Sequence, residues 1–275
     1  MPDGIKQVTL ETTSICNLKC TICPVGRRDM EPRAKIMDGN LAEYIIKTNP
    51  ELERVNLNNW GEPLIHPYFP SIIEMINMYI PTCKVYFSTN GTLFRTSTVH
   101  KIFKNKVHEI QVSLDGVDDV YKTVRGIKYS VVFGKVREMV LYRNRIKSPT
   151  RVVLKAVVNE QTESEISKLI DEWESLVDEV RLQPEIKYGS GKRRVACPEL
   201  FNGHLVVLTD GRVVPCCADY NGKMCVGNVY ESSLIDILSG ERMDYLQRLH
   251  LAGAYPPFCA GCVEYESNLC KRRFG

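Results

Sequence analysis

The sequence predicts an α/β fold: a partial (β/α)6 barrel over residues 1–187, followed by a small cysteine-rich domain over residues 188–275. Two observations lead to this prediction. Over roughly two-thirds of the chain, apolar runs rich in β-branched residues alternate with segments of helical periodicity, and such alternation is typical of a parallel sheet, closed or partly closed as a barrel. After about residue 188 the alternation stops and cysteines become frequent.

The strands and helices are predicted from two kinds of pattern. Runs of β-branched and aromatic residues predict strands at 8–14, 54–60, 84–91, 108–116, 151–159 and 179–186. The spacing of apolar residues between these runs predicts helices at about 38–48, 68–80, 96–106, 130–147 and 164–177. The last helix is the clearest, because its apolar and acidic residues fall on opposite faces.

Polar tripeptides stand at the ends of three predicted strands. They are Gly61-Glu62-Pro63, Thr89-Asn90-Gly91 and Leu114-Asp115-Gly116. Chemistry in parallel sheets gathers at the carboxyl ends of the strands, so these positions are expected to surround a common site. Taken singly, each tripeptide is more often an ordinary turn.

The C-terminal part is expected to begin with a linker at 188–194. A hairpin at 204–217 follows, with Asp210-Gly211 as its two-residue turn. Two helical segments come next, at 232–238 and 241–250, and a Cys-x2-Cys pair at Cys259 and Cys262 closes the module.

Composition and charge limit the classes of function. A net charge of +3 and a pI of about 8.2 are too mild to predict binding to nucleic acid or to a membrane surface. No signal peptide precedes the first predicted strand and no apolar run is long enough to cross a bilayer, so we expect the protein in the cytoplasm. Eleven cysteines, an odd number, favour metal or redox chemistry over a disulfide framework.

Three cysteines within eight residues, Cys16, Cys20 and Cys23, follow the first predicted strand. A structural zinc site is one interpretation, but it needs a fourth ligand and no histidine lies near in the sequence. Closely spaced thiolates also hold cubane iron–sulfur clusters, in which three cysteines leave the fourth iron free for a substrate or cofactor. An open coordination position is typical of a catalytic metal site.

The spacing C-x3-C-x2-C on this loop resembles the signature of the radical S-adenosylmethionine superfamily, and the resemblance covers nearly the whole chain. Gly61 and Glu62 are similar to the end of that family's Gly-Gly-Glu element, which receives the amino group of the cofactor, although Trp60 stands in place of the first glycine. Further positions resemble those that touch the methionine or ribose of the cofactor: Asn90, Ser113, Asp115 and, as weaker parallels, Arg125 and Gln183.

The resemblance implies a specific chemistry. The open iron of a [4Fe–4S] cluster binds S-adenosylmethionine, and one electron from the reduced cluster breaks a C–S bond of this cofactor. The products are methionine and a 5′-deoxyadenosyl radical, which abstracts hydrogen from an unactivated C–H bond. The resemblance also implies a flavodoxin- or ferredoxin-like electron donor, while the protein supplies orientation and excludes water and oxygen.

A second group of cysteines lies in the C-terminal part: Cys197, Cys216, Cys259 and Cys262. Four thiolates close either a zinc or an iron–sulfur site. Their layout resembles the auxiliary-cluster domain called SPASM or, in its shorter form, twitch, and implies one auxiliary [4Fe–4S] cluster. Within the superfamily, the aminocyclitol dehydrogenase type of butirosin biosynthesis is similar in size and in these four positions. Cys83 and Cys270 receive no predicted role.

The expected reaction is dehydrogenation of a small polyol, sugar or aminocyclitol, because an auxiliary cluster can accept an electron from a substrate radical. Epimerisation of a sugar or peptide is the alternative if Cys217 or Cys225 donates a hydrogen atom, and other modification of a peptide also stays open. Glu185, which follows the last barrel strand, is a candidate proton acceptor. A non-catalytic iron–sulfur sensor or zinc module is a remote alternative, because it needs no cofactor-binding strand ends.

Overall fold

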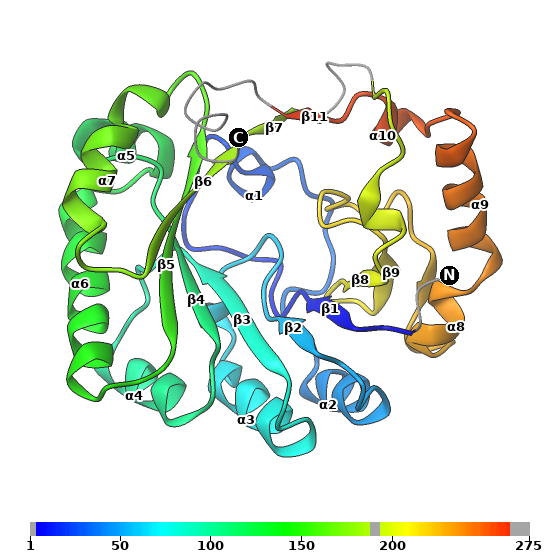
Figure 1. The fold of residues 1–275 in the computed structure, drawn as a ribbon, viewed down its shortest axis with the longest axis horizontal. Coiled ribbons are helices and arrows are strands. Elements are labelled where there is room, and N and C mark those ends of the chain that lie inside the picture. The colour runs from blue at the N-terminus through cyan, green and yellow to red at the C-terminus, as the bar shows by residue number, and fades with distance from the viewer. Residues whose placement is uncertain (1–3, 188–192, 265–275) are drawn as a thin grey trace.

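The computed structural model describes residues 4–187 and 193–264, and its centre is one curved sheet (Figure 1). Within these residues the strand order is β10-β9-β8-β1-β2-β3-β4-β5-β6. Pairing is parallel from β8 through β1 to β6, and antiparallel from β8 through β9 to β10. The strands are β1 (Gln7–Leu10), β2 (Arg54–Asn56), β3 (Lys84–Thr89), β4 (Glu109–Ser113), β5 (Arg151–Val158), β6 (Glu179–Pro184), β8 (His204–Val207), β9 (Arg212–Val214) and β10 (Gly227–Asn228).

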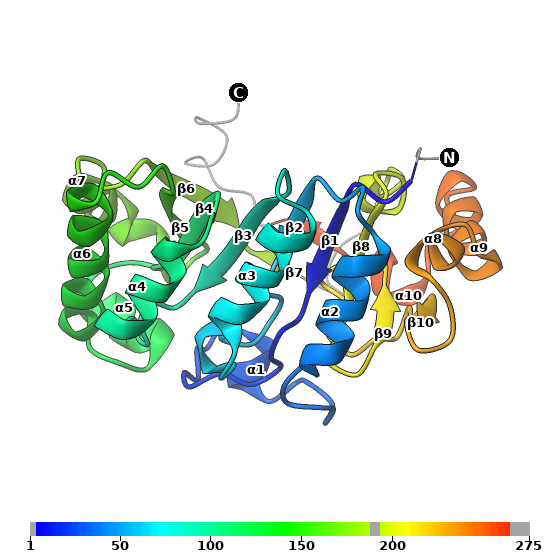
Figure 2. The ribbon, with the colours of Figure 1, turned by 90° about the horizontal axis from the view of Figure 1, so that it is seen from below.

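Helices cover the outer face of the barrel strands, as Figures 1 and 2 show. A second, two-stranded sheet pairs β7 (Ile186–Lys187) with β11 (Val263–Glu264). The helices are α1 (Pro24–Arg27), α2 (Gly39–Thr48), α3 (Phe69–Tyr79), α4 (Thr96–Lys104), α5 (Asp118–Arg125), α6 (Tyr129–Arg145), α7 (Ile166–Trp173), α8 (Leu234–Leu238), α9 (Glu241–Leu251) and α10 (Pro257–Ala260).

The predicted fold class is confirmed. Each predicted barrel strand is present, in most cases shorter than expected, and the five predicted barrel helices correspond to α2, α3, α4, α6 and α7. The short elements α1, α5, α10 and β10 and the sheet of β7 with β11 were not predicted. The pairing of β8 with β1, which joins the predicted C-terminal hairpin to the barrel sheet, was not predicted either. Most of the predicted linker at 188–194 lies outside the described residues.

The predicted hairpin is confirmed with a longer turn than expected. Residues 208–211 connect β8 and β9, in place of a two-residue turn. Gly211 has a φ of 84°, in the left-handed region that favours glycine.

The two faces of the barrel strands differ in polarity. Successive side chains on a strand point to opposite faces. Leu154 and Val180, which are paired on β5 and β6, belong to the apolar core beneath the helices. The residues that follow them, Lys155 and Arg181, are also paired and therefore point to the opposite side, which we call the inner face.

Ion pairs fill the inner face near the amino ends of β4, β5 and β6. Glu109 accepts from Nη1 of Arg151 at 3.0 Å and from Nη1 of Arg181 at 3.1 Å. Glu179 accepts from Nη2 of Arg151 at 2.9 Å and from Nε of Arg181 at 2.7 Å. These four side chains pair with one another, so this end of the inner face is structural.

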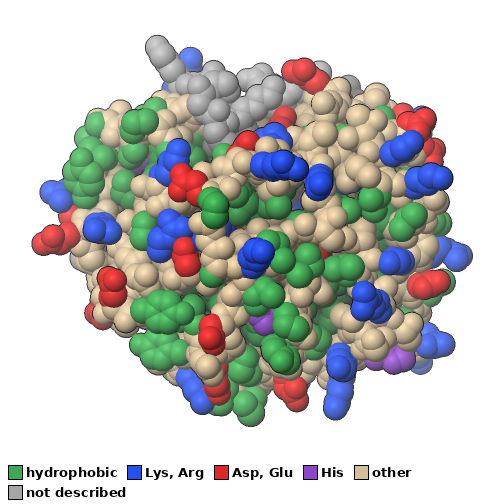
Figure 3. Space-filling view, turned by 180° about the vertical axis from the view of Figure 1, so that it is seen from behind, with side chains coloured by type: hydrophobic (Ala, Val, Ile, Leu, Met, Phe, Trp, Pro, Cys, Tyr) green, Lys and Arg blue, Asp and Glu red, His purple; other side chains and the backbone are tan. Residues whose placement is uncertain are grey.

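The surface has no strongly charged region on the face that Figure 3 shows, where acidic and basic side chains are interspersed. This distribution agrees with the mild net charge of +3. Within the two described segments, no helix combines the length and the apolar character needed to cross a membrane.

Candidate active site

The first group of predicted ligands lies on the loop between β1 and α1. Cys20 is buried, whereas Cys16 and Cys23 are half-buried. Helix α1 starts immediately after Cys23 and packs so closely on the loop that a Cβ on Gly26 would lie 2.2 Å from the carbonyl oxygen of Cys20. Only glycine fits this approach, so α1 holds the cysteine loop in one conformation.

The sulfur of the half-buried Cys16 receives two N–H donors. The backbone N–H of Leu18 donates at 3.4 Å, and Nδ2 of Asn90 donates at 3.6 Å. Burial is the main cause that raises the pKa of the Cys16 thiol to about 11, with smaller contributions from Glu62 and the neighbouring Cys20. A coordinating metal deprotonates such a thiol, and N–H donors then stabilise the thiolate and tune the cluster.

The Gly61-Glu62 element lies directly against the cysteine loop. The backbone N–H of Glu62 donates to the carbonyl oxygen of Ile15 at 2.8 Å. A Cβ on Gly61 would lie 2.1 Å from the carbonyl oxygen of Thr13. The end of β2 therefore reaches the loop only because residue 61 has no side chain.

The carboxylate of Glu62 organises the strand ends around this loop. It accepts hydrogen bonds from the N–H of Leu64 at 3.0 Å, from Oγ1 of Thr89 at 2.7 Å and from the N–H of Asn90 at 2.8 Å. Burial outweighs these donors and raises the pKa of Glu62 to about 7. Asn90 in turn donates to Oδ1 of Asn17 at 3.0 Å, so the end of β3 is also tied to the cysteine loop.

Asp115 and Arg125 form a buried ion pair beside Cys20. Nη2 of Arg125 lies 2.5 Å from Oδ2 of Asp115, and Nη1 donates to the sulfur of Cys20 at 3.9 Å. Burial opposes the charge of Arg125, but the Asp115 carboxylate and the Cys20 sulfur raise the pKa of the guanidinium above its usual value. The guanidinium of Arg125 therefore stays charged next to one predicted ligand, with Asp115 as its counterion.

Two further predicted cofactor residues make no contact with this group in the described chain. Ser113 ends β4 on the inner face, where its partner in the sheet register is Lys155. Gln183 is exposed on β6, where it pairs with Val157. Their roles toward the cofactor stay predictions.

The second group of cysteines comes together from three separate segments. Cys197 precedes a short 3-10 helix, Cys216 follows β9, Cys259 lies in α10 and Cys262 follows α10. Burial is the main cause that raises the pKa of Cys259 to about 12, and the nearby Cys216, Cys197 and Cys262 add to it. Arg193 holds this segment: its Nε donates to the carbonyl oxygen of Cys259 at 3.2 Å.

Both cysteine groups have the donor chemistry of iron–sulfur clusters, since thiolates are the ligands that hold such clusters. In the part of the chain that the structure describes, no three His, Cys, Asp or Glu side chains converge closely enough to hold one ion. A zinc ion needs four ligands at about 2.3 Å, whereas in a cubane each thiolate binds its own iron and the sulfurs lie farther apart. Near Cys20, Oη of Tyr121 and Nε of Arg125 are buried without a hydrogen-bond partner among the described residues, which is consistent with a bound group there.

The loop after β9, which carries Cys216, packs against the loop after β2 and the segment after α1. Nε1 of Trp60 donates to the carbonyl oxygen of Cys217 at 2.6 Å, and its ring meets Tyr220 edge-to-face at 5.7 Å. Nδ2 of Asn221 donates to the carbonyl oxygen of Asp29 at 3.0 Å. The residue that replaces the family's first glycine therefore connects the two cysteine groups, a role that the sequence did not indicate.

Replacing Trp60 is expected to loosen the 216–221 loop. Trp60→Ala removes one hydrogen bond and one aromatic contact, which together contribute about 2 kcal/mol to the local opening free energy. Amide hydrogen exchange of residues 216–221 is therefore expected to accelerate by about an order of magnitude or more, with Trp60→Phe intermediate. Equal exchange rates in all three proteins would show that Trp60 does not hold this loop.

The predicted catalytic residues occupy different places. Cys217 is exposed and lies within electrostatic range of Lys155 on the inner face. Glu185 accepts a hydrogen bond from Nδ2 of Asn159 at 3.4 Å, just beyond β6. Lys155 was not among the predicted site residues, although a single lysine inside the apolar strand sequence RVVLKAVV is a detectable signal.

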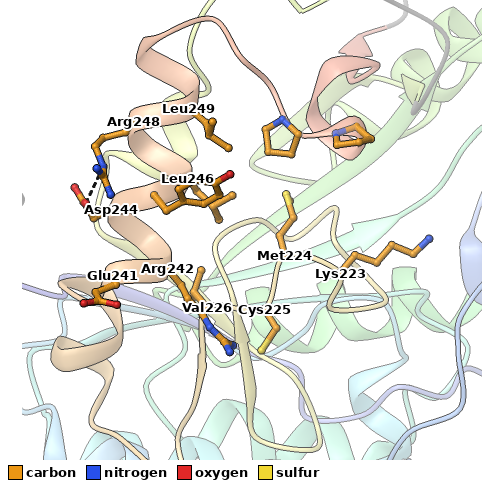
Figure 4. Close-up of a pocket in the computed structure, with 13 residues that line it drawn as sticks. Lys223, Met224, Cys225, Val226, Glu241, Arg242, Asp244, Leu246, Arg248 and Leu249 are labelled. Atoms are coloured by element: carbon orange, nitrogen blue, oxygen red, sulfur yellow. Dashed lines mark ion pairs between the residues drawn. The ribbon is translucent and has the colours of Figure 1, made fainter.

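Cys225 lines a pocket of about 820 Å³ in the C-terminal part (Figure 4). All residues around this pocket come from positions 223–257, so no barrel residue takes part. The pocket borders the second cysteine group, because the sulfur of Met224 lies 3.3 Å from that of Cys259. Cys225 as a hydrogen donor to a substrate in the barrel stays a prediction.

Family models match both parts of the chain. Residues 10–172, more than half of the chain, match the radical SAM superfamily. Residues 197–263 match SPASM, an iron–sulfur cluster-binding domain. The second match contains all four cysteines of the second group.

Relatives known by function align over most of the chain at low identity. The tungsten-containing aldehyde ferredoxin oxidoreductase cofactor-modifying protein of Pyrococcus furiosus is 23% identical over 94% of this chain and 87% of its own. The S-adenosyl-L-methionine-dependent 2-deoxy-scyllo-inosamine dehydrogenase of Niallia circulans is 21% identical over 88% of this chain and 85% of its own.

Solved structures share the fold. BtrN in complex with AdoMet and 2-DOIA superposes with a TM-score of 0.67 at 19% identity, covering 95% of this chain and 94% of BtrN. Streptococcus suis SuiB bound to the precursor peptide SuiA superposes with a TM-score of 0.68 at 15% identity, covering 98% of this chain and 76% of SuiB. The same fold thus accommodates a small molecule in one protein and a peptide in the other.

The two domains define the cofactors. The radical SAM domain means that the protein is an enzyme that uses S-adenosylmethionine with a [4Fe–4S] cluster, and the SPASM domain adds auxiliary iron–sulfur binding. With the matched models and the two cysteine groups in agreement, the chain belongs to the radical S-adenosylmethionine superfamily and carries a C-terminal SPASM domain.

Proposed function

We propose that this enzyme dehydrogenates a small hydroxylated compound: a polyol, a sugar or an aminocyclitol. When bound, S-adenosylmethionine with its cluster supplies the radical that removes a hydrogen atom from carbon, and an auxiliary cluster supplies an electron acceptor. Cys16, Cys20 and Cys23 would hold the first cluster. The ligands of one auxiliary cluster would be Cys197, Cys216, Cys259 and Cys262.

The observation that carries this proposal is the contact between the two cysteine groups. Trp60, on the loop after β2, and Asp29, which follows α1, hold the loop that follows Cys216 through Cys217 and Asn221. An electron acceptor held by Cys216 would therefore lie close to the place where hydrogen is removed, which dehydrogenation requires. The name of the Niallia circulans relative supports this reaction class.

The other residues of the first site are proposed to position the cofactor. Glu62 fixes the loops after β2 and β3, and Asn90 contacts both Glu62 and Cys16. Arg125 directs its positive charge at Cys20. Low-potential electrons are proposed to come from a flavodoxin- or ferredoxin-like donor.

The reaction class is tested in D2O with 2-deoxy-scyllo-inosamine and unsubstituted polyols as probes. Dehydrogenation is expected to give a product two hydrogens lighter than the substrate, without carbon-bound deuterium, because the hydrogen atom leaves with 5′-deoxyadenosine. Mass spectrometry of the product checks its mass and its deuterium content, and mass spectrometry of 5′-deoxyadenosine checks where the hydrogen atom goes. Deuterium at an inverted carbon centre would contradict dehydrogenation.

Epimerisation is the second candidate, and one observation favours it. Cys217 presents an exposed thiol near the inner face, where a hydrogen donor to a substrate radical would have to lie. If the enzyme is an epimerase, Cys217→Ala abolishes product formation while 5′-deoxyadenosine is still released. A dehydrogenase keeps its product in this variant.

A further inference from the structure

Lys155 lies in the middle of the inner face, between the two cysteine groups. In the sheet register it pairs with Ser113 on β4 and with Arg181 on β6. Paired residues on neighbouring parallel strands are about 4.8 Å apart and point to the same face. Ser113 ends β4 two residues before Asp115, whose ion-pair partner Arg125 contacts Cys20. Cys217, adjacent to the proposed ligand Cys216, lies within electrostatic range of Lys155.

Lys155 is half-buried, and its amine has no partner in the described chain. No hydrogen bond or ion pair joins its Nζ to any residue that the structure describes. The nearby arginine is already used, since Arg181 is bound to Glu109 and Glu179. A buried ammonium without a counterion is costly, so this side chain is expected either to be neutral or to meet a ligand.

The surroundings of Lys155 lower the pKa of its amine. Burial is the main cause that lowers its pKa from 10.5, and the next is the positive charge of Arg181 on β6. Cys217 and Glu109 raise this pKa, and Arg54 on β2 makes a smaller contribution that lowers it. The two carboxylate oxygens of Glu109 are already engaged by arginines, so they offer Lys155 no direct ion pair.

We propose that Lys155 accepts the hydroxyl proton of the substrate when an alcohol is oxidised to a ketone; this inference rests on the proposed dehydrogenation. The oxidation removes a hydrogen atom from carbon, which ends in 5′-deoxyadenosine. It also removes one electron, which passes to the auxiliary cluster, and the O–H proton, which forms the ammonium of Lys155. The C–O single bond becomes a double bond, and the ammonium later releases the proton to solvent.

The position of Lys155 suits a proton acceptor better than the position of Glu185 does. The Glu185 carboxylate already accepts a hydrogen bond from Asn159 beyond the end of β6. Lys155 has a free lone pair when neutral, and it lies between the strand end of the first site and the loop of the second. A general base needs a pKa close to the working pH, and the burial of Lys155 moves its pKa in that direction.

The test compares reconstituted wild-type enzyme with Lys155→Met and Lys155→Arg, using 2-deoxy-scyllo-inosamine as the probe. Lys155→Met removes the amine at similar volume, and Lys155→Arg keeps a positive charge that cannot accept a proton. Both variants are expected to form ketone about a hundredfold more slowly, or worse, while still releasing 5′-deoxyadenosine. The wild-type rate is expected to rise with pH as the amine becomes neutral, and both variants are expected to lose this rise.

A second readout does not depend on turnover. The reconstituted protein is acetylated competitively across a pH series and analysed by mass spectrometry. The experiment gives the pH at which the amine of Lys155 becomes nucleophilic. It is expected to react at lower pH than the amine of Lys168, which is exposed on α7 and ion-paired with Glu165 at 2.9 Å. Lys168→Met and Lys168→Arg are the matched controls and are expected to leave ketone formation and its pH profile unchanged.

The outcomes separate this inference from the proposed function. Full ketone formation by Lys155→Arg would overturn the proton-acceptor role and indicate binding of an anionic group. Full activity of Lys155→Met, or acetylation at the same pH as Lys168, would also overturn it. If the wild type forms no ketone, or inverts a carbon centre with deuterium, the proposed dehydrogenation fails and this role of Lys155 fails with it.

Discussion

A Cys16→Ala variant is expected to release no 5′-deoxyadenosine from S-adenosylmethionine. Cys16 supplies one of three closely spaced sulfurs, and its sulfur already receives N–H donors from Leu18 and Asn90. With two thiolates left, the first cluster loses a ligand that no described residue nearby replaces. The measurements are iron per chain and 5′-deoxyadenosine after anaerobic reconstitution with a reductant. Iron is expected to fall from about eight to about four per chain, the content of one cubane.

Cys83→Ala is the matched control for this substitution. Cys83 lies in the apolar core at 7% exposure, and its thiol donates weakly to the carbonyl oxygen of Lys84 at 3.8 Å. Its replacement is expected to cost about 1 kcal/mol of stability and to leave both readouts unchanged. Release of 5′-deoxyadenosine by Cys16→Ala at the wild-type rate would contradict the assignment of the first cluster.

Substitutions in the second cysteine group are expected to lower the iron content without abolishing cleavage of S-adenosylmethionine. A Cys259→Ala/Cys262→Ala variant is also expected to hold about four irons, but to keep slow release of 5′-deoxyadenosine. Zinc in the wild-type protein with only about four irons would contradict the auxiliary cluster.

Local pattern predicted the barrel because each barrel strand is a short apolar run between helices. It missed α5, because two buried residues, Tyr121 and Val124, are too few to mark a helix of eight residues. It also missed the pairing of β8 with β1, because a hydrogen-bonded register between distant segments leaves no trace in either segment alone. The sheet therefore extends into the part of the chain that we expected to be separate.

The residues of the candidate site also include some that the sequence predicted and some that it did not. Cys16, Cys20 and Cys23 were predictable because ligands on one loop have a characteristic spacing. The importance of Lys155 was not, because it depends on which face of β5 the side chain takes and on which neighbours are already paired. Trp60 was recognised only as a departure from the family pattern, since its partner Cys217 lies far along the chain.

Gly61→Ala is expected to impair the first site although it adds one methyl group. The new Cβ would lie 2.1 Å from the carbonyl oxygen and 2.6 Å from the carbonyl carbon of Thr13, and 2.8 Å from the carbonyl oxygen of Ile15. All three neighbours are backbone atoms, so the loop between β1 and the cysteines must move by about 1 Å. A displacement of this size costs about a hundredfold in rate when it misplaces reacting groups.

Gly134→Ala separates this steric effect from the general cost of adding a methyl group. Gly134 lies inside α6, and a Cβ there meets no atom within 4 Å. The substitution is expected to stabilise the protein by about 0.5–1 kcal/mol, since alanine has the higher helix propensity. Gly61→Ala is expected to lose about 1–3 kcal/mol through overpacking. Urea denaturation measures both stabilities, and calorimetric titration of the reconstituted proteins with S-adenosylmethionine measures binding. If Gly61→Ala binds the cofactor as tightly as Gly134→Ala, the close approach of residue 61 to the cysteine loop does not shape the cofactor site.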